Sequence, residues 1–78
     1  MARVIDLVDK NIKLIKIFVK AGKMPLSIMT DYDIYKFYKT INYEKAQMKK
    51  YDIVAKNFKV SAKTVQRAVS EMEKNVTN

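Results

Sequence analysis

Neither cysteine nor histidine occurs among the 78 residues of this chain. Without thiols it can form no disulfide and no thiolate metal site, and without imidazole it lacks the commonest metal ligand and general base. Its acidic residues are scattered, and a single glycine cannot build a glycine-rich phosphate loop. We therefore expect no metal, no cofactor, no small-molecule ligand and no enzymatic activity.

Glycine and proline are scarce as well, with one of each in the chain, Gly22 and Pro25. No run of alternating β-branched residues indicates a strand, and the apolar residues recur at helical spacing. No apolar stretch approaches the roughly 18 residues that cross a bilayer. The basic first twenty residues contain Asp6 and Asp9, which is atypical of a transit peptide. The sequence predicts an all-α, cytoplasmic protein with four helices.

The basic residues are unevenly distributed along the chain. There are 16 basic and 8 acidic residues, which gives a net charge of +8. Residues 45 to 67 contain seven of the basic residues and a single acid, Asp52. A basic surface of this kind attracts polyanions such as nucleic acid or acidic lipid, although charge alone does not choose between them.

The first predicted helix runs from about residue 3 to residue 21 and is amphipathic, with its apolar residues on one half and its lysines on the other. Gly22 can take the left-handed conformation that ends a helix, and Pro25 prevents continuation. The apolar half is wider than one neighbouring helix can cover, which favours a homodimer built on this helix. The residues expected at the dimer contact are Leu7, Asn11, Leu14, Ile15 and Phe18.

Asn11 lies near the centre of this apolar half, where an unpaired amide would cost about 1 to 3 kcal/mol. It can pair with its copy in a second subunit, as a buried asparagine does in coiled coils. Alternatively, it bonds a backbone carbonyl within its own subunit, and the sequence leaves both interpretations open. The helix could also lie on an anionic membrane, but two acids on its polar face and the absence of tryptophan disfavour that hypothesis.

Two further helices are predicted in the middle of the chain. Thr30 and Asp33 have the spacing of a capping box, so a second helix should start near Asp31. Asn42 can cap a third helix. The predicted buried residues of the second helix are Ile34, Phe37, Tyr38 and Ile41, and those of the third are Met48, Tyr51, Val54, Ala55 and Phe58. The tyrosines are interpreted as packing residues rather than as platforms for single-stranded bases.

A fourth helix, capped by Ser61, completes a specific pattern of residue types. Two short helices that cross closely need a small residue at the crossing, and Ala55 provides one. Val60 can fill the space beneath the turn. The residues predicted to face inward from the fourth helix, which fades near Lys74, are Val65, Ala68, Val69 and Met72.

This stretch resembles the helix-turn-helix of bacterial transcription regulators, and the pattern of Val-Ala, Val-Ser, Thr-Val, Arg and Val is similar to that of the lactose-repressor family. The motif follows a helical region, as in small phage activators of the Mor type. The resemblance implies duplex DNA binding, with Ala62, Lys63 and Arg67 at base edges and with Ser61 and Thr64 at phosphates. One departure is Lys59, which stands where the turn usually has glycine; a left-handed lysine costs about 1 kcal/mol.

With the apolar residues inward, the outward residues of the fourth helix are short, polar and basic, as a helix entering the major groove requires. The expected base-reading residues are Ala62, Lys63, Gln66, Arg67 and Ser70, and the expected phosphate contacts are Lys49, Lys50, Lys56, Lys59, Ser61 and Thr64. Residues 1–24 would form an N-terminal amphipathic helix, and residues 25–78 a helical DNA-binding domain with its helix-turn-helix at about residues 51–74.

The sequence thus favours a small, sequence-selective DNA-binding transcription regulator of phage or mobile-element type. Two alternatives remain open at this level. The chain could be the DNA-binding subunit of a phage packaging or recombination assembly. It could also be a helical adaptor between proteins, because some helix-turn-helix units bind protein instead of DNA.

Overall fold

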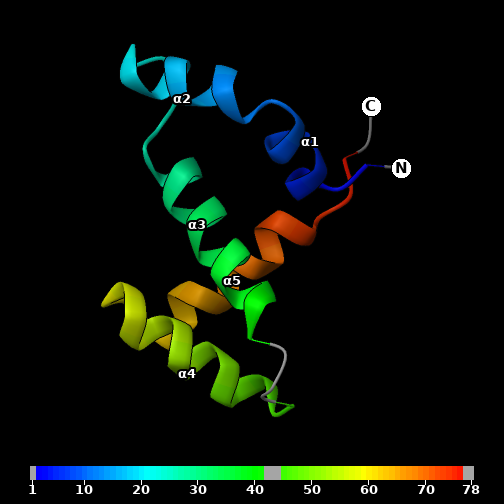
Figure 1. Ribbon diagram of the computed structural model, residues 1–78, viewed down its shortest axis with the longest axis vertical. Coiled ribbons are helices and arrows are strands. Elements are labelled where there is room, and N and C mark those ends of the chain that lie inside the picture. The colour runs from blue at the N-terminus through cyan, green and yellow to red at the C-terminus, as the bar shows by residue number, and fades with distance from the viewer. Residues whose placement is uncertain (1, 42–44, 77–78) are drawn as a thin grey trace.

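The computed structural model describes residues 2–41 and 45–76 of the chain. Within these residues it is all-helical, as predicted, but it has five helices instead of four. Figure 1 shows their arrangement, with α3 and α5 crossing at the centre, α4 beneath them, and α1 and α2 at the other end. The helices are α1 (Val4–Lys10), α2 (Ile12–Lys20), α3 (Ser27–Thr40), α4 (Gln47–Phe58) and α5 (Ala62–Glu73).

The additional helix arises because the first predicted helix is broken at Asn11. The backbone of this residue departs from helical values, with φ −115° and ψ 22°. Its side-chain amide donates a hydrogen bond of 2.8 Å to the carbonyl oxygen of Leu7. Asparagine competes in this way with the backbone ladder, so it is a natural place for a helix to break. The bond to a backbone carbonyl within its own subunit, one of the two interpretations of Asn11, is therefore present.

The end of α2 is the one expected from the sequence. Gly22 has a φ of 75°, in the left-handed region, and its amide bonds the carbonyl of Val19. The amide of Lys23 bonds the carbonyl of Phe18 at 2.9 Å. These two bonds form a Schellman motif, which satisfies carbonyls that the last turn of a helix otherwise leaves free.

The next helix starts earlier than predicted. The capping box at Thr30 is wrong, because α3 begins at Ser27 and Thr30 lies in its first turn, with its amide bonded to the carbonyl of Leu26. Pro25 lies just before this turn, where its missing N–H costs nothing. The predicted cap Asn42 lies outside the described residues. Helix α4 begins at Gln47, with Ala46 in the N-cap position.

A single apolar core joins all five helices. Its most deeply buried side chains are Ile34 of α3, Val54 of α4 and Val65 of α5, each with no exposed surface. Ile5 and Val8 of α1 and Ile15 of α2 are also buried in it. Ile15 was expected at a dimer contact, but it is taken up by the core of its own subunit.

Three of the predicted core residues are not fully buried, because Met48 is exposed and Phe37 and Phe58 are half-buried against the core. Met48 was expected to point inward from α4, yet it is 63% exposed in the first turn of that helix. Phe37 is half-buried and meets Phe58 edge-to-face, with ring centroids 5.8 Å apart. Tyr35, which was not among the predicted buried residues of the second helix, is buried on α3.

The two ends of the chain lie side by side. An antiparallel bridge joins Arg3 to Asn75, and the amide of Val4 bonds the carbonyl of Lys74 at 2.8 Å. Helix α1 is thereby held against the C-terminal end of α5, while α2 leads away from both termini (Figure 1). None of the helices in the described parts of the chain is long and apolar enough to cross a membrane.

Candidate nucleic-acid interface

Helices α4 and α5 are joined by a three-residue connection with a defined geometry. Lys59 has a φ of 58° and a ψ of 44°, so the lysine takes the left-handed conformation in which glycine is usual. The amide of Val60 then bonds the carbonyl of Ala55 at 3.0 Å, and Val60 packs against the core. The turn is thus retained despite the lysine, with a backbone cost of about 1 kcal/mol.

Ser61 caps α5 as the sequence predicted. Its hydroxyl oxygen accepts the amide of Thr64 at 3.1 Å, and the two hydroxyl oxygens lie 3.0 Å apart. A serine cap of this kind stabilises a helix by roughly 1 kcal/mol. Both hydroxyls remain near the N-terminus of α5, where free amides and the helix dipole favour a negative group.

The inward face of α5 also matches the prediction. Four residues at helical spacing are each at most 3% exposed, namely Val65, Ala68, Val69 and Met72. They pack mainly against α3 and α4. Ala55 of α4 is buried as well, which fits its expected place at a close helix crossing. Because this face is fully covered, the orientation of α5 about its own axis is fixed.

The outward face of α5 therefore consists of polar side chains. Lys63, Gln66, Arg67 and Ser70 are all exposed, and no hydrogen bond or ion pair within the described ranges engages them. Ala62, which was also expected in the base-reading set, is half-buried and packs against the core. The exposed polar face of α5 thus begins at Lys63.

An acidic boundary, which the sequence analysis missed, borders this face. Asp31 of α3 lies near enough to Arg67 and Glu71 of α5 to interact with both electrostatically. Partial burial raises the pKa of the Asp31 carboxyl, an effect that Glu71 reinforces and the Arg67 guanidinium opposes. The proximity of Asp31 to Arg67 could not be predicted from the sequence, because the two residues are 36 positions apart in the chain. A polyanion would therefore favour the N-terminal half of α5 over its C-terminal end.

The lysines expected at phosphates differ in how exposed their side chains are and in whether they contact other residues. Lys49, Lys56 and Lys59 are exposed, whereas Lys50 is half-buried with its ammonium nitrogen 5.4 Å from the centre of the Tyr38 ring. A cation over a tyrosine face is attracted by the ring, typically by about 0.5 to 1 kcal/mol at exposed sites. Lys50 is thus partly engaged in the fold, and Lys49 and Lys56 are the freer cations of α4.

The tyrosines pack within the protein, as expected. Tyr38 and Tyr51 stack at 5.7 Å between ring centroids, and Tyr35 stacks on Tyr38 at 6.3 Å. The side-chain amide of Gln47 donates to the hydroxyl oxygens of Tyr38 and Tyr51 at 3.1 and 2.8 Å. Burial raises the pKa of the Tyr38 hydroxyl. Tyr43 lies outside the described residues.

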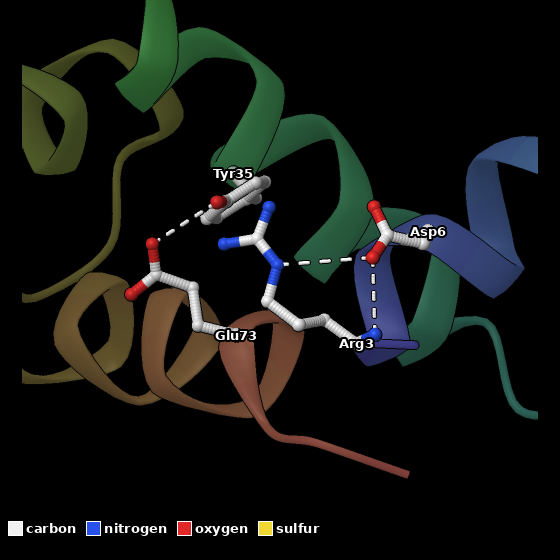
Figure 2. A network of polar contacts seen from close by, with 4 residues as sticks. All are labelled: Arg3, Asp6, Tyr35 and Glu73. Carbon is white, nitrogen blue, oxygen red and sulfur yellow. Dashed lines mark hydrogen bonds and ion pairs between the residues drawn. The ribbon is translucent and has the colours of Figure 1, made fainter. Parts of the chain in front are cut away.

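A polar network fixes the acidic end of α5. Figure 2 shows the hydroxyl of Tyr35, which donates to a carboxylate oxygen of Glu73 at 3.0 Å, and the Arg3 guanidinium, which lies beside the Tyr35 ring. Asp6 accepts the backbone amide of Arg3 at 3.0 Å and lies 3.8 Å from its guanidinium. This end of α5 is thereby tied to α1 and α3.

The residues expected at a dimer contact are separated by the break at Asn11. Leu7 is 40% exposed on α1, and Leu14 and Phe18 are 50% and 38% exposed on α2. Ile17, which the sequence analysis did not select, is 61% exposed and lies beside them on α2. At 100° per residue Ile17 falls on the charged half of the predicted helix, between Asp6 and Lys10, so helical spacing gave no signal for it.

Comparison of the chain with models of protein families, with curated proteins and with solved structures found no match. The function of the protein must therefore be inferred from its own residues.

Proposed function

We propose that this protein binds duplex DNA sequence-selectively through a helix-turn-helix formed by α4 and α5, and that it acts as a small, non-enzymatic transcription regulator. Helix α5 is the recognition helix of this proposal. Lys63, Gln66, Arg67 and Ser70 would reach base edges in the major groove, and Lys49, Lys56 and Lys59 would contact phosphates together with the hydroxyls of Ser61 and Thr64.

One observation carries the proposal: α5 has a fully buried apolar face and a free polar face in register with it. Val65 has no exposed surface, while Lys63 and Arg67, two residues to either side, are exposed and form no ion pair with any residue that the structure describes. A helix that reads bases must be held rigidly from behind and must present unpaired hydrogen-bond donors in front. The inward packing of α5 provides the first condition and its outward residues the second.

The charge distribution supports DNA as the polyanion. Five lysines lie between residues 49 and 63 of the described α4–α5 region, against the single acid Asp52. Phosphate contacts supply most of the affinity for duplex DNA and position the reader, while base contacts supply the selectivity. A guanidinium at Arg67 can donate two hydrogen bonds to guanine O6 and N7, which is the commonest specific contact in the major groove.

A selection of bound sequences from random duplex DNA tests this function. The parent protein is expected to enrich a defined motif, and a variant with Arg67→Ala is expected to enrich a motif that is degenerate at one base pair. Asp33→Asn on α3 provides a control at an exposed carboxylate away from the proposed interface, and it should enrich the parent motif. Failure of the parent to enrich any sequence would reject sequence-selective binding and favour a helical adaptor between proteins.

A further inference from the structure

Helix α2 carries positive charge that no acidic residue of the helix balances. Three of its residues are exposed lysines that form no ion pair and no cation–π contact with any residue that the structure describes. At 100° per residue they fall within about 60° of one another, so they form one strip along the helix. We call this strip the α2 lysine row, and its members are Lys13, Lys16 and Lys20.

The two acidic residues that precede α2 in the sequence are engaged on α1. Asp6 accepts the backbone amide of Arg3 and lies 3.8 Å from its guanidinium. Asp9 accepts the Tyr32 hydroxyl and lies 3.6 Å from the ammonium group of Lys36. In one continuous helix both acids would share the polar side with the lysine row, but the break between α1 and α2 puts them on a separate helix. The α2 lysine row is therefore a purely basic surface.

Other lysines of the described chain are engaged by the fold. Lys36 and Lys74 form ion pairs with carboxylates at 3.6 and 2.9 Å. The ammonium nitrogen of Lys39 lies 5.9 Å from the centre of the Tyr35 ring. A lysine that already has a carboxylate or an aromatic ring as partner offers less free charge to a ligand. The lysine row of α2 has neither kind of partner, so its charge is available to a polyanion.

Helix α2 lies at one end of the longest axis of the molecule and α4 lies at the other, with α5 crossing between them (Figure 1). This axis measures 36 Å. One turn of duplex DNA measures about 34 to 36 Å. A duplex that receives α5 in its major groove near the centre of the molecule would therefore extend as far as α2.

We infer that the α2 lysine row contacts the phosphate backbone of the duplex that α5 reads, outside the groove that α5 enters. The inference rests on the proposed function for the choice of duplex DNA as the polyanion, and on charge complementarity for the contact. The row spans about 10 Å along the helix. Over that length a duplex carries about six phosphate charges. Ammonium groups on flexible stems bind phosphates as point charges and need no fixed geometry.

The contact uses one side of α2 only. Leu14 and Phe18 lie on the far side of Ile17 from the lysine row, so a phosphate backbone against the row leaves them uncovered. Binding through α2 should thus depend on charge and on salt, and Ile17→Ala should leave it unchanged. Because phosphates carry no sequence information directly, the row adds affinity and fixes register, while selectivity stays with α5.

A salt titration of DNA binding tests the inference, with a duplex that extends at least one turn beyond the selected site on each side. Replacing the whole lysine row by glutamine should lower the salt slope by about 2 to 3, because each lost phosphate contact lowers it by about 0.9. The matched control replaces three engaged lysines by glutamine, which removes the same charge, and it should change the slope by less than about 1. The variant combines Lys13→Gln, Lys16→Gln and Lys20→Gln, and the control combines Lys36→Gln, Lys39→Gln and Lys74→Gln.

Trimming the duplex to the bases that α5 protects should abolish the difference between the parent and the α2 variant. Both should prefer the selected site over a scrambled duplex to the same degree, because neither loses a base contact. Sequence preference thus tests α5, while the slope tests α2. A parent without sequence preference whose slope still falls in the α2 variant would reject base reading by α5 and support the backbone contact.

An unchanged slope in the α2 variant, or an equal fall in the control, would overturn the inference while leaving sequence-selective binding by α5 intact. An unchanged slope together with lost binding to vesicles of anionic phospholipid would overturn it in favour of a lipid surface. Circular dichroism should show equal helicity for all the proteins, since every replaced lysine is exposed.

Discussion

Helices α5 and α2 are both amphipathic, yet they present opposite surfaces to solvent. In α5 the apolar face is covered by α3 and α4, and the free face carries Lys63 and Arg67. In α2 the core takes only Ile15 completely, and the apolar Ile17 remains exposed. The difference shows that an amphipathic pattern predicts which side of a helix is apolar. It does not predict whether the rest of the same chain covers that side. The uncovered side of α5 is polar and basic, whereas that of α2 is apolar along one edge and basic along the other.

The largest expected effect is on the free energy of unfolding, and it is seen by replacing one apolar residue in each of the two helices. Val65→Ala on α5 should lower the free energy of unfolding by about 2 kcal/mol, because it removes fully buried methyl groups and leaves a cavity. Ile17→Ala should change the stability of the monomer by less than about 0.5 kcal/mol, because Ile17 is 61% exposed. Urea unfolding of dilute protein measures both. Equal losses of unfolding free energy in the two variants would contradict the finding that Ile17 lies on an exposed face of α2.

The second comparison is between the C-terminal ends of α2 and α4, each of which is followed by a residue with a positive φ. Gly22 and Lys59 both have a positive φ, and a side chain at Gly22 would meet no atom within 4 Å. Gly22→Ala should therefore cost about 1 kcal/mol through backbone strain alone. Lys59→Gly should add about 0.5 to 1 kcal/mol by removing the same strain. Amide hydrogen exchange in α2 and in α4 would report each change locally, and a stabilising Gly22→Ala would contradict this account.

The acidic boundary beside α5 predicts a smaller effect on binding. Asp31→Asn should raise the affinity for duplex DNA by about twofold, because it removes a negative charge that interacts with Arg67 across a partly solvated gap. Asp33→Asn removes the same charge from an exposed position on α3 and is the control. Fluorescence anisotropy with labelled duplex can resolve this difference. A greater gain from Asp33→Asn would place the interface elsewhere.

The smallest effect concerns the polar contact that ties α1 to α3. The Tyr32 hydroxyl donates to Asp9, and Lys36 lies 3.6 Å from the same carboxylate. The hydrogen bond from Tyr32, with Lys36, holds the pKa of Asp9 below its ordinary value of 3.8, and Asp9 raises the pKa of Tyr32 to about 12. The lowered pKa of Asp9 gives a stabilisation that is present above pH 3.8 and is lost as the pH falls through the folded value.

For Tyr32 the sign is reversed, because its raised pKa gives a stabilisation that is present below its ordinary value of 10.0 and is lost as the pH rises through about 12. The contact between α1 and α3 should thus hold at neutral pH and weaken at both extremes. Tyr32→Phe should move the pKa of Asp9 upward, which a carboxyl-carbon NMR titration can measure. An unchanged Asp9 in this variant would show that the hydrogen bond does not form in solution.

The sequence was most informative where local chemistry decides the structure. Ser61 is a cap because its own side chain reaches the first turn, and Gly22 ends α2 because its φ is positive. The inward residues of α5 follow from spacing alone, since one uninterrupted helix carries all of them. These features depend on neighbours within a few residues, so they could be predicted without knowledge of the fold.

The sequence was least informative where distant segments decide. The break at Asn11 could not be read from spacing, because Ile5, Val8 and Ile15 would share one face of a continuous helix and are buried here on two separate helices. Likewise, Met48 and Ala62 each lie at a helix start, where burial depends on how far the neighbouring helix extends. The approach of Asp31 to Arg67 requires α3 and α5 to cross. Helical spacing contains none of this information.

The proposed role of α5 is tested most directly by a salt titration of three proteins against a selected site and a scrambled duplex. Arg67→Ala should cost about 1 to 3 kcal/mol on the selected site and much less on the scrambled duplex, because the lost contact reads a base. Lys49→Ala should weaken both duplexes alike and lower the salt slope by about 1. Equal weakening of both duplexes by Arg67→Ala would contradict base reading by α5, and a parent that fails to bind duplex DNA at low salt would contradict the DNA-binding function itself.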